Sequence, residues 1–329
     1  MTVETTTIPI VTVAGCNGVN GRSFTKLYKE KLSGYRQWKQ LGHAEEYVLH
    51  GDNVGENLSI DETSLSNGEV YTVVTNKAAK GRKGALVAMI KGVAGDKVIE
   101  KLKLLGLSKR RKVRTVTADL SGSMKYIAGM AFPSAEQISD RFHVQQLMSQ
   151  AIDEMRIELR WEVIRAENEQ IRLCRQQKTQ YRPDIEANGE TLRQIFARSK
   201  HIMTRNMTKW SDPQRKRAEI LFERYPQLKT AYKLSMKLTD IYNERITAPV
   251  ARLKLARWYN ELERFDPVRF KTVIDTFTTH SDTIINYFND RLTNASAESF
   301  NAKIKDLRRQ FRGINDTPFF LFRLSALYG

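Results

Sequence analysis

The chain has 329 residues, of which 41% are hydrophobic, and its 54 lysines and arginines outnumber 37 acidic residues, which gives a net charge of +17. This length and apolar content are enough for a substantial core, and they favour two folding units over one. A disordered basic tail is therefore excluded. The positive charge favours a polyanion as the partner.

Membrane and disulfide-stabilised proteins are also disfavoured. No apolar run approaches the roughly 18 residues that a membrane span needs, and residues 1–7 lack the basic region of a secretory signal. A cytoplasmic location is the simplest expectation. Cys16 and Cys174 are isolated from each other, so the sequence offers neither a disulfide framework nor a zinc ribbon. Any bound metal is expected to have oxygen ligands.

Residues 1–50 form an N-terminal segment with two expected elements. Residues 8–13 are β-prone, and after a glycine-rich turn residues 24–35 have the pattern of a short basic helix. That helix is compatible with part of a DNA-binding helix-turn-helix or with a packing helix, and packing is the commoner role.

Residues 51–143 change to strands separated by short turns, the first of them at Asn67–Gly68. The expected order is three strands, a helix, a strand, a short helix and a strand, over residues 57–61, 69–75, 85–91, 95–105, 113–118, 123–130 and 137–139. This order is that of a ribonuclease H-like mixed sheet, in which the first and fourth strands are parallel neighbours. Their ends would bring Asp61 and Asp119 together at the sheet edge, where open α/β sheets bind ligands.

Residues 144–290 are expected to be entirely helical. The first helix covers residues 144–178. Trp161, Trp210 and Trp258 could stack on exposed bases, but most aromatic residues at helical spacing belong to the core, and we expect a core position for all three. Prolines interrupt the rest of the segment at positions 183, 213, 226, 249 and 267.

Residues 291–329 are expected to contain one more helix, which follows the N-cap residues at 293–296 and ends at Gly313. Glu298 lies in its first turn, and the spacing of Glu298, Asn301 and Lys305 predicts that they share one face. Basic runs on helices are usually solvated faces, but the run on this helix is a candidate DNA contact. The candidate DNA-binding residues are Asn301, Lys303, Lys305, Arg308 and Arg309.

The acidic residues and their order resemble a known family. The motifs are Asp61–Glu62, Asp119, the run from Asp140 to Val144 that includes Arg141 and His143, and the run from Asn294 through Glu298 to Lys305. Together they are similar to the catalytic domain of bacterial insertion-sequence DDE transposases of the ISL-three group, over about residues 35–329. The resemblance implies a ribonuclease H-like core with a large helical insertion between the second and third acids.

The resemblance also implies a chemistry. Asp61, Asp119 and Glu298 would hold two Mg²⁺ or Mn²⁺ ions, which suit carboxylate ligands and assist phosphodiester cleavage. Glu62, Asp140, Arg141 and His143 are auxiliary candidates. The common alternative for each aspartate is a turn or a helix cap, and for Glu298 a favourable position near the positive end of a helix.

The implied activity is DNA cleavage and strand transfer at the terminal inverted repeats of an insertion sequence by a homo-oligomer. Family members often carry an N-terminal zinc ribbon and helix-turn-helix, and this chain lacks the ribbon cysteines. A separate DNA-binding protein is therefore expected to assist. Two other functions remain open: a ribonuclease H-like nuclease or resolvase, and a non-enzymatic basic nucleic-acid-binding protein.

Overall fold

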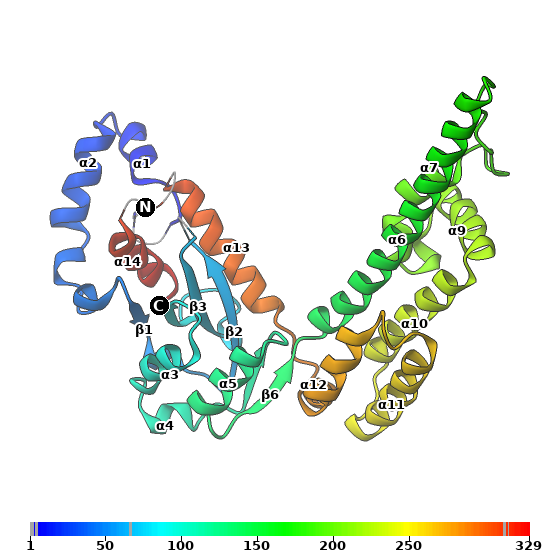
Figure 1. The fold of residues 1–329 in the computed structure, drawn as a ribbon. Helices are drawn as coiled ribbons and strands as arrows, with labels where there is room; N and C mark the ends of the chain where they lie inside the picture. Colours follow the sequence, from blue (N-terminus) through cyan, green and yellow to red (C-terminus); the bar gives the residue numbers. More distant parts are fainter. Residues whose placement is uncertain (1–2, 4–5, 66–67, 312–313, 315) are drawn as a thin grey trace. The chain divides into compact units, whose positions relative to one another are not determined.

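The structure is a computed structural model that describes residues 3, 6–65, 68–311, 314 and 316–329. The chain divides into two compact units (Figure 1). The α/β unit comprises Met1–Asp140 and Asp290–Gly329, and the helical unit comprises Arg141–Asn289. In the described residues, no helix is both long and apolar enough to cross a membrane.

A six-stranded mixed sheet forms the centre of the α/β unit, with the strand order β1-β4-β3-β2-β5-β6. The strands are β1 Tyr47–Leu49, β2 Asn57–Ser64, β3 Val70–Asn76, β4 Leu86–Lys91, β5 Thr115–Ala118 and β6 Glu136–Ser139. Strands β2, β3 and β4 are an antiparallel meander, whereas β5 is parallel to both β2 and β6. The predicted parallel pairing of the first and fourth strands is confirmed. A mixed sheet with many helices is compatible with a ribonuclease H-like fold.

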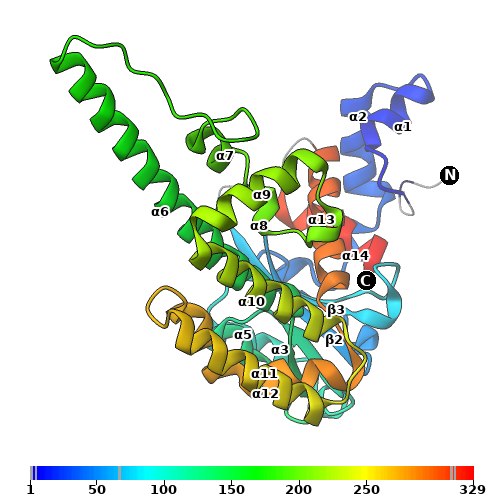
Figure 2. The ribbon, with the colours of Figure 1, turned by 90° about the vertical axis from the view of Figure 1, so that its right-hand side faces the viewer.

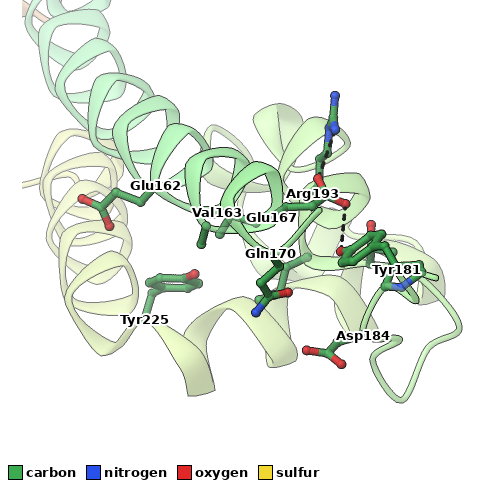
Figure 3. Close-up of a pocket in the computed structure, with 12 residues that line it drawn as sticks. Glu162, Val163, Glu167, Gln170, Tyr181, Asp184, Arg193 and Tyr225 are labelled. Atoms are coloured by element: carbon green, nitrogen blue, oxygen red, sulfur yellow. Dashed lines mark hydrogen bonds and ion pairs between the residues drawn. The ribbon is translucent and has the colours of Figure 1, made fainter. Parts of the chain in front are cut away.

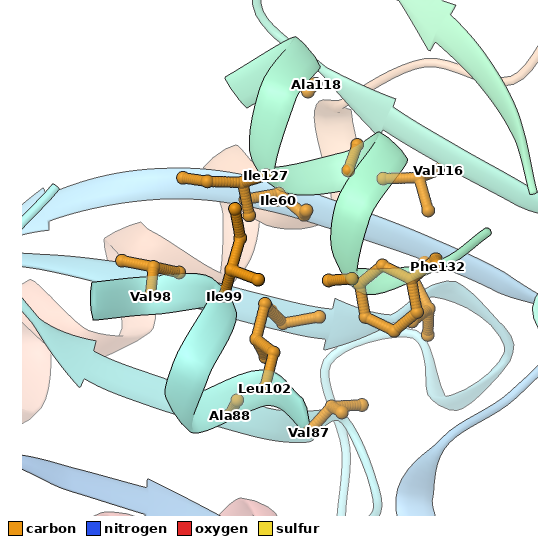
Figure 4. Packing of buried hydrophobic residues seen from close by; sticks show 14 of the residues in the cluster. Ile60, Val87, Ala88, Val98, Ile99, Leu102, Val116, Ala118, Ile127 and Phe132 are labelled. Carbon is orange, nitrogen blue, oxygen red and sulfur yellow. The ribbon is translucent and has the colours of Figure 1, made fainter. Parts of the chain in front are cut away.

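One face of this sheet is covered by apolar side chains of α3 (Gly95–Lys103) and α5 (Gly122–Ala131). Figure 4 shows Ile99 and Leu102 of α3 beside Ile60 of β2 and Ile127 of α5. The short helix α4 (Leu107–Arg110) follows α3. Both longer helices were predicted. Their apolar residues recur at helical spacing, which places Val98, Ile99 and Leu102 on one buried stripe.

The opposite face carries α13 (Ala295–Gln310) and α14 (Thr317–Tyr328). Phe300 and Ile304 of α13 pack with Tyr71 and Val73 of β3 in a second apolar cluster. The C-terminal helix α14 was not predicted. Gly313, the expected end of α13, and Asn67 of the first expected turn lie outside the described residues.

The N-terminal segment is helical, so the β-prone assignment of residues 8–13 is wrong. Helix α1 (Ile10–Cys16) buries Ile10 and Ala14, which lie one helical turn apart, and this packing overrides the local preference of β-branched residues. Helix α2 (Gly21–Leu27) continues into a π-helix at Tyr28–Leu32. Tyr28 packs with Phe319 of α14.

The helical unit begins with a single long helix, α6 (Arg141–Gln176), close to the predicted 144–178. The helices that follow are α7 Leu192–Ala197, α8 Lys200–Met203, α9 Asp212–Arg224, α10 Pro226–Asn243, α11 Ala248–Phe265 and α12 Lys271–Asp290 (Figure 2). Prolines occupy the first turn of α9, α10 and α11, as the sequence indicated. Trp258 and Trp210 are buried, but Trp161 is 54% exposed, so its assignment to the core is wrong.

Candidate active site

Three aspartates lie level with one another on three neighbouring parallel strands, at the point where the parallel pairing ends. The pairing of β2 with β5 aligns Ser59 with Thr117. The same register, continued by two residues, places Asp61 level with Asp119. The pairing of β5 with β6 aligns Ala118 with Ser139. The next residue on each strand is an aspartate, so Asp119 is level with Asp140. The carboxyl ends of parallel strands are the usual ligand-binding edge of such a sheet.

Asp61 lies within β2 rather than at its end, because β2 continues to Ser64 alongside β3. The pairing of β2 with β5 ends at Ser59, two residues before Asp61. The Asp61 carboxylate is held at both oxygens: Oδ1 accepts from the backbone N–H of Glu62 at 2.8 Å, and Oδ2 accepts from the Asn301 amide at 2.8 Å.

The DNA contact predicted for Asn301 does not fit its position. Asn301 is only 7% exposed, and its amide nitrogen also donates to the Glu62 carbonyl at 3.1 Å. Asn301 therefore fixes the orientation of Asp61. Ala297 and Ile304 of α13 are also buried and lie at helical spacing from Asn301. From this pattern the sequence could have predicted that Asn301 faces the core.

Asp119 begins the turn that leads from β5 into α5. Its Oδ1 accepts from the backbone N–H of Ser121 at 3.0 Å, and the Ser121 hydroxyl in turn caps α5 by accepting from Met124 N–H. Asp119 therefore does stabilise a turn, which was the alternative role for this aspartate, but it does so with only one of its carboxylate oxygens. The turn holds the Asp119 side chain at the end of β5.

Asp140 and Glu298 come together from distant parts of the chain. Asp140 is 1% exposed, and one of its carboxylate oxygens lies within 4.8 Å of one from Glu298, which is exposed in the first turn of α13. The Asp140 Oδ1 atom also accepts from the backbone N–H of Asn294, the N-cap of α13, at 3.2 Å. Among the described residues, Asp61, Asp119 and Glu298 do not by themselves form so close a group.

The carboxylates at the sheet edge influence one another. The pKa of Glu62 is raised, first by burial and then by the negative charges of Asp119 and Asp61. Such repulsion shows that the acids lie close enough for their charges to interact. Burial also lowers the pKa of Lys77, which follows β3, to about 8, although the charge of Asp140 opposes this shift.

The other auxiliary candidates, Arg141 and His143, begin helix α6 of the helical unit. Arg141 donates to the Tyr287 hydroxyl at 3.1 Å and to Asn243 Oδ1 at 3.0 Å, so it joins α6 to α12 and α10. His143 is the third residue of α6 and is half-buried.

The basic residues of α13 differ in what they contact. Lys303 donates to the Gly81 carbonyl at 2.6 Å and so ties α13 to the turn between β3 and β4. Lys305 and Arg309 are exposed, Arg308 is half-buried, and Arg309 is paired with Asp306. Lys305, Arg308 and Arg309 therefore remain the better candidates for phosphate contacts.

A cavity of about 330 Å³ lies within the helical unit, beside the second half of α6 (Figure 3). Glu167 accepts hydrogen bonds there from Arg193 at 3.0 Å and from the Tyr181 hydroxyl at 3.5 Å. The cavity is lined by residues of α6 and of the segments that follow it. This cavity therefore shares no lining residue with the group of Asp61, Asp119 and Asp140.

Two residues that shape the site, Lys77 and Asn294, were not predicted as site residues, although Asn294 begins one of the motifs that resemble the family. Lys77 donates to the Thr117 hydroxyl and to the Thr293 carbonyl, and Asn294 contacts Asp140 and Ile60. Lys77 follows a predicted strand directly, and Asn294 belongs to a predicted helix cap. These positions were visible in the sequence, but their partners lie far away along the chain.

Residues 58–324 match the model of a protein family that is described as a transposase family, the DDE transposases of the ISL3 type. This chain belongs to that transposase family. The match runs from β2 to α14 and includes Asp61, Asp119, Asp140 and Glu298. The transposase is therefore a nucleic-acid-cleaving enzyme with DNA as its partner, and DDE transposases generally use divalent metal ions. No curated protein matches this chain.

Proposed function

We propose that this transposase cleaves DNA strands at insertion-sequence ends and joins them to target DNA, in a ribonuclease H-like core whose active site is the edge bearing Asp61, Asp119 and Glu298. The observation that carries the proposal is the alignment of Asp61, Asp119 and Asp140 across three neighbouring parallel strands, with α13 hydrogen-bonded over them. Asp140 joins the predicted three acids because its carboxylate lies within 4.8 Å of that of Glu298.

The residues present fit a divalent metal ion. All four acids offer hard oxygen ligands, which suit Mg²⁺ or Mn²⁺. Burial raises the pKa of Glu62 first, and the negative charges of Asp119 and Asp61 raise this pKa further; a cation would relieve the second, repulsive contribution. When bound, a pair of such ions would activate the attacking oxygen and stabilise the leaving oxygen of a phosphodiester.

The chain's own residues would hold the ions and fix their ligands. Asp61 would be a ligand to both ions, and its two oxygens are kept in place by Asn301 and the Glu62 N–H. Asp119 would hold one ion and Glu298 the other, with Asp140 beside Glu298. Water would attack first, and the freed 3′-hydroxyl would then attack target DNA, without a covalent protein intermediate.

DNA would lie along the exposed basic residues of α13, namely Lys305, Arg308 and Arg309. The net charge of +17 supports binding to DNA phosphates. We expect a homo-oligomer to hold two element ends together and a separate protein to assist in recognising the terminal repeats. Affinity for terminal-repeat DNA, measured with this chain alone, tests the second expectation: tight, sequence-selective binding would contradict it.

The activity is tested by incubating the protein with pre-cleaved element ends, a target plasmid and Mg²⁺. We expect joined products from the wild type, and from Asp119→Asn we expect no joining but unchanged DNA binding. Asp306→Asn is the matched control, because Asp306 is an exposed acid on α13 paired with Arg309. Cleavage without joining would indicate a nuclease, and full activity of Asp119→Asn would indicate that the acids are structural.

A further inference from the structure

Lys77 connects three elements around the strand-end acids. It is the first residue after β3, and its ammonium group donates to the Thr117 hydroxyl at 2.7 Å and to the Thr293 backbone carbonyl at 2.5 Å. Thr117 lies on β5, two residues before Asp119, and Thr293 lies five residues before Glu298. One side chain thus holds the segments that precede two of the proposed metal ligands.

The segment that Lys77 holds is also fixed by its next residue. The Asn294 backbone N–H donates to Asp140 at 3.2 Å, and the Asn294 side chain donates to the Ile60 carbonyl at 3.4 Å. Helix α13 begins at the following residue and reaches Glu298 within one turn. Because a helical turn moves as a rigid piece, a shift of residues 293–294 would move the Glu298 carboxylate relative to the strand ends.

The position of the Lys77 amine is unfavourable by itself. Burial favours the neutral form of the amine and lowers its pKa to about 8. A buried ammonium is tolerated only when hydrogen bonds replace its water. The contacts with Thr117 and Thr293 supply these hydrogen bonds. This arrangement is expected of an amine whose role is to hold its two partners in place.

We propose that Lys77 is a positioning residue that sets the spacing between Glu298 and Asp119, so that both can bind metal. This inference rests on the proposed function. Lys77 acts through Thr117 and Thr293 and is not itself a metal ligand. Partners that orient metal ligands typically contribute about 10- to 100-fold to metal affinity or activity.

The test measures Mn²⁺ affinity of the full-length protein by calorimetry, together with the melting temperature and the strand-transfer rate. We compare Lys77→Met with Lys97→Met, the same change at an exposed site on α3. A second pair keeps the lysine charge: Thr117→Val removes the acceptor hydroxyl, whereas Thr117→Ser keeps it. This pair tests the inference even if Lys77→Met does not fold.

The direction of the change separates the roles of Lys77. Loss of a positive charge alone would tighten Mn²⁺ binding, because the acids would attract the cation more strongly. Loss of positioning is expected to weaken binding about 10- to 100-fold in Lys77→Met, and about tenfold in Thr117→Val, with Thr117→Ser and Lys97→Met near the wild type. Unchanged or tighter binding in both Lys77→Met and Thr117→Val would overturn the inference, even if the melting temperature falls.

Asp119→Asn distinguishes this inference from the proposed function. If Asp119→Asn loses Mn²⁺ binding while Lys77→Met and Thr117→Val match the wild type, the metal site stands and the role of Lys77 is refuted. If Asp119→Asn binds Mn²⁺ as the wild type does, the proposed metal site itself is wrong.

Discussion

The two faces of the central sheet are held by different kinds of interaction. On the α3 and α5 face, apolar side chains such as Ile60, Ile99 and Ile127 make the contacts with the sheet, whereas hydrogen bonds such as that from the Tyr126 hydroxyl to Asp96 join the helices to one another. On the α13 face, apolar packing of Phe300 and Ile304 is joined by hydrogen bonds that reach the strand ends. These bonds connect Lys77 with Thr293, Asn294 with Asp140, Asn301 with Asp61, and Lys303 with Gly81.

The difference follows from what each face has to do. Apolar burial is strong but has no preferred direction, so it stabilises the sheet without fixing a helix to a fraction of an ångström. Hydrogen bonds are directional and fix the position of one element along another. Helix α13 carries Glu298, so its hydrogen bonds are expected to affect metal binding, and the apolar face is expected to affect stability.

The largest effect is expected for Asp61→Asn. The amide cannot replace the charge of the proposed shared ligand, and losing several kcal/mol of transition-state stabilisation would lower the strand-transfer rate by roughly a thousandfold. Circular dichroism and DNA affinity should be unchanged. A rate within tenfold of the wild type would contradict the assignment of Asp61.

The apolar face is tested by Leu102→Ala. Leu102 is fully buried, and its truncation should lower the free energy of unfolding by about 2–5 kcal/mol. Urea denaturation measures this change. The Mn²⁺ affinity of the folded Leu102→Ala protein should equal that of the wild type. If its Mn²⁺ affinity fell as far as that of the α13 variants, the two faces would not differ in their effect on metal binding.

The hydrogen-bonded face is tested by Asn301→Ala. Loss of the amide leaves Asp61 Oδ2 without this donor, so Mn²⁺ affinity should fall about 10- to 100-fold. Calorimetry at constant pH measures the affinity. Asn301→Asp is expected to be worse, because it places a second negative charge beside Asp61. Equal affinity in the wild type and Asn301→Ala would show that apolar packing alone positions α13.

The smallest effect concerns pH. The pKa of Lys77 is about 8 in the folded protein and 10.5 ordinarily, so between these values the unfolded chain binds more protons than the folded one. The free energy of unfolding of the wild type should therefore rise with pH relative to that of Lys77→Met, by at most about 1.4 kcal/mol per pH unit. Urea titrations at pH 7, 8.5 and 9.5 measure this difference, and parallel pH profiles would contradict it.

The sequence predicted the features that depend on local pattern. The strands around Asp61 and Asp119, the long helix α6 and the proline-initiated helices all follow from apolar spacing and from residues that break helices. The parallel pairing of β2 and β5 also followed, because the order of the elements restricts the topology. Strand β1 was missed because three residues carry too little alternation to detect.

The parts of the site that were not predicted depend on tertiary contacts. Lys77 follows a predicted strand, and only the folded sheet brings Thr117 and Thr293 to its amine. Asn301 was assigned to DNA because it lies between Glu298 and Lys305, but the apolar stripe of α13 turns it inward. Residues 10–16 form a helix for a similar reason, because packing outweighs their local β preference.

The α/β unit is interrupted, since α13 follows the sheet only after the 149 residues of Arg141–Asn289. During synthesis the ribosome therefore releases Asp61, Asp119 and Asp140 long before Glu298 is made. A nascent or truncated chain that stops within the helical unit contains the sheet but lacks the last proposed ligand. A chain must therefore be extended past Glu298 before it contains all four acids proposed to hold the metal ions.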